Sequence, residues 1–297
     1  TGDGHRAVVH VANNHTNIIY VERDGEVLLE KPHSDSAEDN LQDKSVLNVR
    51  DILTFAETVD VSRIEDSVGR QIDCNTAIAR EGLRGDWGAN IGSTLLLSGG
   101  DVETEARAWA AAGSDARMNG CALPVAIVCG SGNQGITCAL PVMEYAEYLR
   151  CDHERLVRAV MLSDLIAVHI KSYIGALSAF CGAICASCGA GAAITWLCGG
   201  TREQIGATVS NTLGNVGGIV CDGAKASCAA KISAAVDAAI LGHDMAMQGR
   251  GFRAGEGLIQ DTVEETIASM GYVGRVGMKD TDVEILNIMI GKTIVDC

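Results

Sequence analysis

Two cysteines seven positions apart could bind a metal ion or cluster. Cys221 follows the glycine pair 217–218, and Cys228 precedes an alanine-rich segment that reads as a helix. A glycine-broken helix start would let both thiols point the same way. The N-terminal end of a helix also stabilises the thiolate, which is the form that binds metals. The pair therefore indicates a metal site, although the spacing alone does not identify the metal.

Three cysteines upstream have a second suggestive spacing. Cys181, Cys185 and Cys188 form a C-x3-C-x2-C pattern, which is found in radical SAM enzymes. There the motif lies on a loop after a barrel strand, and an aromatic residue usually precedes the last cysteine. Here Ser187 holds that position, and no β/α repeat surrounds the segment. Positions i, i+4 and i+7 also share one helix face, so as a unit these cysteines are expected to be small side chains at a helix contact.

A glycine-rich run at residues 130–135, GSGNQG, matches the G-x-G-x-x-G pattern of dinucleotide-binding turns. It follows a strand-like segment, but the second strand of such a unit would fall at residues 156–173, which read as a helix. We therefore expect no Rossmann unit. A glycine-rich loop can still hold a carboxylate with backbone N–H groups, assisted here by the hydroxyl of Ser131 and the amide of Asn133.

Composition limits the partners of these motifs. The 297 residues carry a formal net charge of -15, which argues against a nucleic-acid partner because phosphate binding needs a surplus of Lys and Arg. No signal peptide is visible, and most of the 12 cysteines lie in apolar runs of small residues. We therefore expect a cytoplasmic protein with reduced thiols. Because the chain starts at Thr1, its first residues carry no information about targeting.

The elements that must position these residues are mainly helical. Residues 7–11, 17–22 and 26–30 alternate like strands and predict a small antiparallel meander, followed by a polar loop. Helical spacing begins near Val49 and continues to the end. The predicted fold class is therefore α+β, with a region 1–112 that holds the meander and a helical domain 113–297 that holds the metal site.

An uncharged stretch at residues 174–200 is long enough to span a bilayer. It consists largely of Ala, Gly, Ser and Cys, which contribute little transfer free energy. The sequence therefore favours a central helix, or a broken pair of helices, packed on all sides, and it predicts no membrane association.

Several motifs resemble one known family. The run 221–231, CDGAKASCAAK, resembles the C-D-G-A-x-x-S-C-A-x-K signature of the L-cysteine desulfidase family, which is related to the alpha subunit of iron-sulfur L-serine dehydratase. Further motifs of that family occur in the same order: HTNI at 15–18, EGLRGDWG at 81–88, SDARM at 114–118, GSGNQG at 130–135 and LSAFC at 177–181.

The resemblance implies a 4Fe-4S cluster held by Cys181, Cys221 and Cys228, with one iron left open. Soft thiolates suit iron–sulfur clusters, and an iron without a protein ligand can act as a Lewis acid. The implied reaction is β-elimination by an L-cysteine desulfidase, which gives pyruvate, ammonia and sulfide. L-serine dehydratase activity on the same scaffold is the first alternative.

The same resemblance implies that Ser131, Gly132 and Asn133 bind the small amino-acid substrate, although a structural turn would explain them too. Asp115 and Arg117 are further candidates for substrate binding; the alternative is a buried ion pair between them that shapes the pocket.

The general base is expected elsewhere. In this family it is thought to be a Cys in an L-G-C-T-E-P motif upstream of H-T-N, and nothing in this chain matches that motif. We therefore expect the family's N-terminal portion to be absent from this sequence, so that the chain alone lacks the base; His15 is the candidate within it.

Two further alternatives follow from the missing motif and from the donor set. The chain could be a non-catalytic metal-binding subunit or remnant, and three thiolates plus a water would also suit zinc. We expect a homo-oligomer, or association with a chain that carries the missing part.

Overall fold

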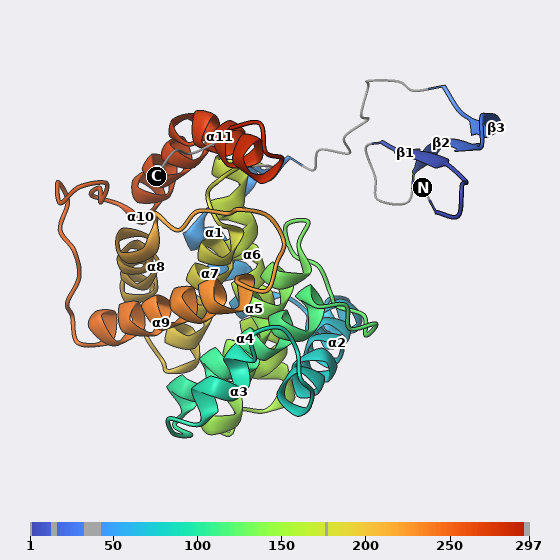
Figure 1. Cartoon of the computed structure of the whole chain (residues 1–297). Helices are drawn as coiled ribbons and strands as arrows, with labels where there is room; N and C mark the ends of the chain where they lie inside the picture. The colour runs from blue at the N-terminus through green and yellow to red at the C-terminus, as the bar shows by residue number, and fades with distance from the viewer. Residues whose placement is uncertain (1, 13–16, 33–42, 176–177, 294–297) are drawn as a thin grey trace. The chain divides into compact units, whose positions relative to one another are not determined.

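A computed structural model describes residues 2–12, 17–32, 43–175 and 178–293. The chain forms two compact units, residues 1–45 and 46–297, which are described separately (Figure 1). The sequence placed a boundary at 112/113 instead. That position falls inside helix α4 (Val102–Met118), which packs against α2, α5 and α9. Hydrophobic periodicity marks helices well, but it does not show which helices share a core.

The first unit is the predicted meander. Strands β1 (Ala7–Val11), β2 (Ile18–Arg23) and β3 (Glu26–Glu30) pair antiparallel in the order β1-β2-β3. The turn between β2 and β3 uses Asp24 and Gly25, both with positive φ (52° and 88°), which Asp tolerates and glycine favours. His15 lies outside the described residues.

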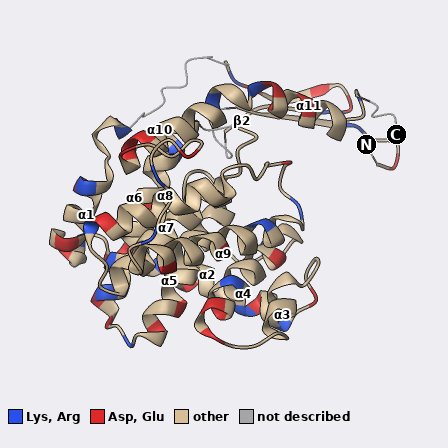
Figure 2. Ribbon diagram, turned by 90° about the vertical axis from the view of Figure 1, so that its left-hand side faces the viewer, with Lys and Arg blue, Asp and Glu red and all other residues tan. Residues whose placement is uncertain are grey.

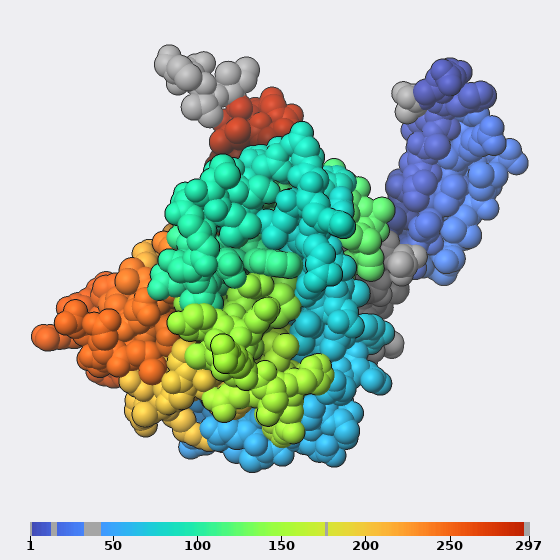
Figure 3. All heavy atoms as spheres, turned by 90° about the horizontal axis from the view of Figure 1, so that it is seen from below, coloured from blue at the N-terminus to red at the C-terminus, as the bar shows by residue number. Residues whose placement is uncertain are grey.

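The second unit is a bundle of helices, so the predicted α+β class with a mainly helical chain is correct. Besides α4, the helices are α1 (Val49–Thr58), α2 (Glu65–Arg84), α3 (Ile91–Leu96), α5 (Gly132–Tyr148), α6 (His153–Ile174), α7 (Gly182–Leu197), α8 (Arg202–Val216), α9 (Cys228–Met247), α10 (Val263–Tyr272) and α11 (Lys279–Met289). Figure 3 shows the blue-green helices α2 to α4 together on one face of the molecule.

Helix α7 is the centre of the bundle, and it contacts α5, α6, α8 and α9. Of its 16 residues, 14 are buried and none is charged, so its ribbon is tan in Figure 2. Small residues are required there: a Cβ on Gly189 would lie 2.2 Å from the carbonyl oxygen of Ser163 on α6. The stretch 174–200 thus holds one buried central helix, α7, which is the first of the two predicted forms. No helix among the described residues is long and apolar enough to cross a bilayer.

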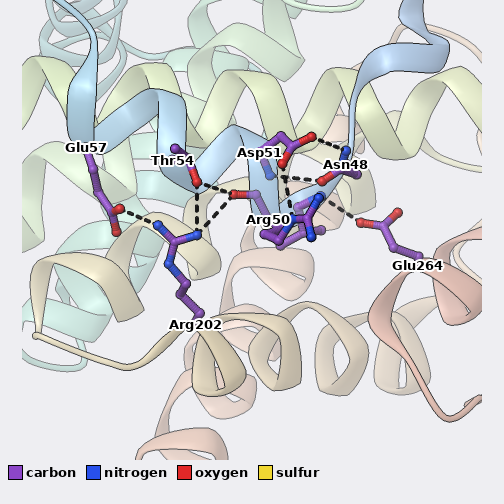
Figure 4. A network of polar contacts seen from close by, with 8 residues as sticks. Asn48, Arg50, Asp51, Thr54, Glu57, Arg202 and Glu264 are labelled. Atoms are coloured by element: carbon purple, nitrogen blue, oxygen red, sulfur yellow. Dashed lines mark hydrogen bonds and ion pairs between the residues drawn. The ribbon is translucent and has the colours of Figure 1, made fainter.

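Polar contacts hold α1 against α8 and α10 at the edge of this core (Figure 4). Arg202, the first residue of α8, donates a hydrogen bond to the Thr54 hydroxyl at 3.0 Å and pairs with Glu57. Glu264 on α10 accepts the N–H of Val49 at 2.7 Å. The N–H groups at the start of α1 therefore gain a partner from a helix that is distant in sequence.

Candidate cysteine site

A short backbone bridge brings Cys181 and Cys221 together. Phe180 and Val220 form an isolated antiparallel β-bridge. On either side of it, the N–H of Cys181 donates to the carbonyl of Ile219 at 3.1 Å, and the N–H of Cys221 donates to the carbonyl of Ala179 at 2.6 Å. Residues paired in this way lie side by side whatever their distance in sequence. The segment before α7 is thereby fixed to the segment after α8.

A hydrogen bond links the two thiols. Cys181 is 9% exposed and Cys221 is partly exposed. The Cys181 thiol stabilises the Cys221 thiolate, which lowers the pKa of Cys221 to about 6. The same hydrogen bond, together with burial, raises the pKa of Cys181. One member of the pair is therefore disposed to carry the negative charge that a metal ligand needs.

Cys228 completes the group of three cysteines. It is the first residue of α9, and its Sγ lies 3.6 Å from the carbonyl oxygen of Gly223. The charge of Cys228 acts on the pKa values of Cys181, Arg117 and Lys231, so these side chains occupy the same electrostatic neighbourhood. The backbone bridge thus pairs the segments of Cys181 and Cys221, and Cys228 lies within electrostatic range of Cys181. The three cysteines come from three separate segments.

A lysine joins two of these segments. The Nζ of Lys231, one turn into α9, donates to the carbonyl oxygen of Val220 at 3.0 Å and pairs with the carboxylate of Asp222. This hydrogen bond to Lys231 is the main reason that the pKa of Asp222 is lowered. Lys225 lies 3.4 Å from the same carboxylate.

The start of α5 meets the end of α4 in the same neighbourhood. A Cβ on Gly132 would lie 2.5 Å from the Nε of Arg117, so only glycine lets the guanidinium approach the helix start so closely. The Nη1 of Arg117 donates to the Oδ1 of Asn133 at 3.2 Å. Ser131 is the N-cap of α5, yet its side chain makes no cap hydrogen bond. The first N–H groups of α5 and the Ser131 hydroxyl are therefore available to a carboxylate.

Gln134 lies at the start of α5, and the sequence analysis did not select it as a candidate. Its amide packs on the first residue of α7, where a Cβ on Gly182 would lie 2.7 Å from the Cδ of Gln134. The side chain is 6% exposed, and its Oε1 has no hydrogen-bond partner among the described residues. Gln134 connects the glycine-rich run directly to the helix that follows Cys181. Its place in GSGNQG was the only signal for it.

Asp115 lies apart from this neighbourhood. It is fully buried, and its Oδ2 accepts the N–H of Gly92 on α3 at 3.0 Å. Burial raises the pKa of its carboxyl group. The alternative of an ion pair with Arg117 is wrong, because residues two apart on a helix point in different directions. The structure thus brings Arg117, but not Asp115, to the cysteines.

The other cysteine pattern is a helix contact, as expected. Cys185 and Cys188 are fully buried inside α7, and burial raises the pKa of both thiols, that of Cys185 to about 12. The Rossmann interpretation also fails as expected. In the described part of the chain the only sheet is the antiparallel meander, and α5 continues through Pro141.

The donor set suits an iron–sulfur cluster. Three cysteine thiols from three segments, with Arg117 and Lys231 within electrostatic range of Cys228, are of the soft anionic type that such clusters take as ligands. Across residues 2–12, 17–32, 43–175 and 178–293, no three His, Cys, Asp or Glu side chains are arranged to enclose a single metal ion. A separate cavity of about 1060 Å³ lies between α2, α4 and α5, and neither a cysteine nor Arg117 or Lys231 lines it.

Comparison with known proteins gives consistent matches over nearly the whole chain. Residues 14–287 match the family model of the serine dehydratase alpha chain. A UPF0597 protein of Desulfitobacterium hafniense (strain Y51) is 50% identical over 285 residues, which cover 96% of this chain and 66% of that protein. A UPF0597 protein of Lachnoclostridium phytofermentans is also 50% identical, over 96% of this chain and 68% of its own length. A UPF0597 protein of Treponema denticola is 43% identical over 97% of this chain and 68% of its own length. The chain spans about two thirds of the length of these curated relatives.

Proposed function

Because the chain belongs to the serine dehydratase alpha chain family, we propose that it is the cluster-binding part of a β-eliminating lyase. Its first substrate is L-cysteine, which with water gives pyruvate, ammonia and sulfide. L-serine, which gives pyruvate and ammonia, is the second. The observation that supports the proposal is the backbone bridge that pairs the Cys181 and Cys221 segments, with Cys228 within electrostatic range of Cys181.

Cys181, Cys221 and Cys228 would hold a 4Fe-4S cluster. The β-bridge presets two of the ligands, and the start of α9 supplies the third. When bound, a cluster with three protein ligands supplies one iron that acts as a Lewis acid toward the substrate's leaving group. A sulfur leaving group is a natural partner for such an iron, which favours L-cysteine over L-serine.

The start of α5 would bind the substrate carboxylate. Ser131 offers an uncommitted hydroxyl, and the first N–H groups of the helix point out of its end. Asn133 is oriented by its hydrogen bond to Arg117, so its amide N–H₂ group is free to donate. These groups would orient the amino acid, with its side chain toward the cysteines. Asp115 is left out because it is buried against α3.

Nearby cations offset the negative charge that the proposed site would add to an acidic protein. The chain carries a net charge of -15, and three thiolates and a carboxylate would add to the repulsion. Arg117 and Lys231 lie within electrostatic range of the sulfurs and offset this charge. The reaction belongs in a reducing compartment such as the cytoplasm, because oxidation would remove the thiolates.

The test is anaerobic reconstitution of the full-length protein with iron and sulfide, followed by assays of pyruvate and sulfide. We expect a brown protein with broad visible absorption that dithionite bleaches, and equal release of the two products from L-cysteine. Pyruvate from L-serine alone would establish the second candidate. A colourless protein with stoichiometric zinc would support a zinc site, and a cluster without turnover would support a non-catalytic subunit; either would overturn the proposal.

A further inference from the structure

The position of the Cys221 segment relative to the helix that begins at Cys228 must be fixed by side-chain contacts. The β-bridge ties Cys221 to Cys181, but two residues after Cys221 the chain turns at Gly223, which has a φ of 91°, before it reaches α9. Any ligand set built from the three cysteines depends on the distance between these two segments. Lys231 is the side chain that crosses from α9 to the Cys221 segment.

Lys231 contacts both sides of Cys221. Its Nζ donates to the carbonyl oxygen of Val220 at 3.0 Å and pairs with Asp222, so it binds the residues immediately before and after the cysteine. Its side chain is 22% exposed, whereas that of Lys225, which shares the same Asp222 carboxylate at 3.4 Å, is 40% exposed. An ammonium group that is partly buried and makes two hydrogen bonds is held more firmly than one in an exposed ion pair.

The position of Lys231 is unfavourable for the helix itself. It lies one turn from the N-terminus of α9, where the helix dipole disfavours a cation, and the first turn holds no acidic residue to offset it. The helix therefore gains nothing from a lysine here. The gain lies in the contacts outside the helix, at Val220 and Asp222.

We propose that Lys231 is a positioning residue that clamps the Cys221 segment to the start of α9 and offsets the charge of the sulfur ligands. The clamp is a property of the chain alone; its role toward a cluster rests on the proposed function. Lys225 serves as a matched control, because it pairs with the same carboxylate without reaching Val220.

The test compares Lys231→Met, Lys231→Arg and Lys225→Met in the reconstituted full-length protein. We expect Lys231→Met to release iron to a chelator roughly ten- to a hundred-fold faster, as is typical when the partner of a metal ligand is lost. Its cluster potential should fall, because a nearby cation stabilises the added electron. Lys231→Arg should restore the potential, and Lys225→Met should stay within about twofold of wild type in iron release. Unchanged release and potential in Lys231→Met, or equal effects at both lysines, would overturn the proposal.

A second measurement separates the clamp from the cluster. Hydrogen exchange of the apoprotein should be faster at residues 219–223 in Lys231→Met than in Lys225→Met, with similar exchange in α7. If wild type binds no cluster, the proposed function fails while this comparison still decides whether the clamp exists. Equal exchange in the two variants would show that Lys231 does not hold the segment.

Discussion

The cysteines inside α7 differ from those at the helix starts in what surrounds them. Cys185 and Cys188 are fully buried among small apolar residues, and burial raises the pKa of both thiols. Cys181 and Cys221 share a hydrogen bond next to Lys231. One residue type therefore serves as inert packing in one region and as a source of thiolate in the other. Cysteine spacing could not separate the two, because Cys181 belongs to both patterns.

The difference arises from where a helix begins. In the interior of α7 the N–H and C=O groups are paired along the helix, and Cys185 and Cys188 are packed among buried, mostly small residues. At the starts of α7 and α9, free N–H groups, an adjoining loop and cations favour negative charge. The contrast teaches that a ligand set is better sought at converging helix ends than along one helix face.

The largest effect should come from removing the sulfurs at the helix starts. Cys181→Ser, Cys221→Ser or Cys228→Ser is expected to abolish cluster binding in the reconstituted full-length protein, because each removes one of three soft ligands. Iron and sulfide analysis with visible absorption measures the loss.

Cys188→Ala is the control for that series. It should retain the cluster and lower the free energy of unfolding by only about 1 kcal/mol, since a small buried side chain is shortened. A normal cluster in Cys221→Ser, or loss of the cluster in Cys188→Ala with folding intact, would contradict the assignment of the ligands to the helix starts.

A smaller effect should follow from crowding the centre of α7. In Gly189→Ala the new methyl group would lie 2.2 Å from the Ser163 carbonyl oxygen, so α6 and α7 must separate. We expect the free energy of unfolding to fall by about 3 kcal/mol, measured by denaturant titration. Gly69→Ala, in α2 with no atom within 4 Å of the new methyl group, should instead raise it by about 0.5 kcal/mol. Equal destabilisation at both positions would argue against close packing at α7.

The smallest effect concerns the cavity between α2, α4 and α5, where most of the charged side chains in the lining are carboxylates. Burial, with nearby Glu105 and Glu147, raises the pKa of Glu144 from 4.5 to about 7. A carboxyl whose pKa is higher in the folded state destabilises the fold progressively as pH rises from about 4.5 to 7. Relative to wild type, Glu144→Gln should therefore gain about 2 kcal/mol of stability between pH 5 and 8. Parallel stability curves for the two proteins would contradict this prediction.

Local patterns were enough to predict the meander and the buried helix. Alternating residues and a turn at Asp24 and Gly25 define the three strands, and uncharged small residues define α7. The motifs around Cys221 and Cys228 also named the region where the cysteines meet. In each case the information lies within a few adjacent turns of chain.

Features that depend on contacts between distant segments could not be predicted. The continuity of the helical unit across 112/113 depends on which helices share a core, and the bridge of Phe180 to Val220 leaves no periodic signal. Asp115 and Arg117 are close in sequence but serve different neighbours. The contact between Gln134 and Gly182 depends on the packing of α5 against α7.

The bridge between Phe180 and Val220 also dictates an order of events during biosynthesis. Helices α7 and α8 lie between its two ends, so the pairing can form only after both have emerged and folded back on each other. The third sulfur follows later still, at the start of α9. If the three cysteines hold a cluster, as proposed, their set is complete only once the start of α9 has been synthesised.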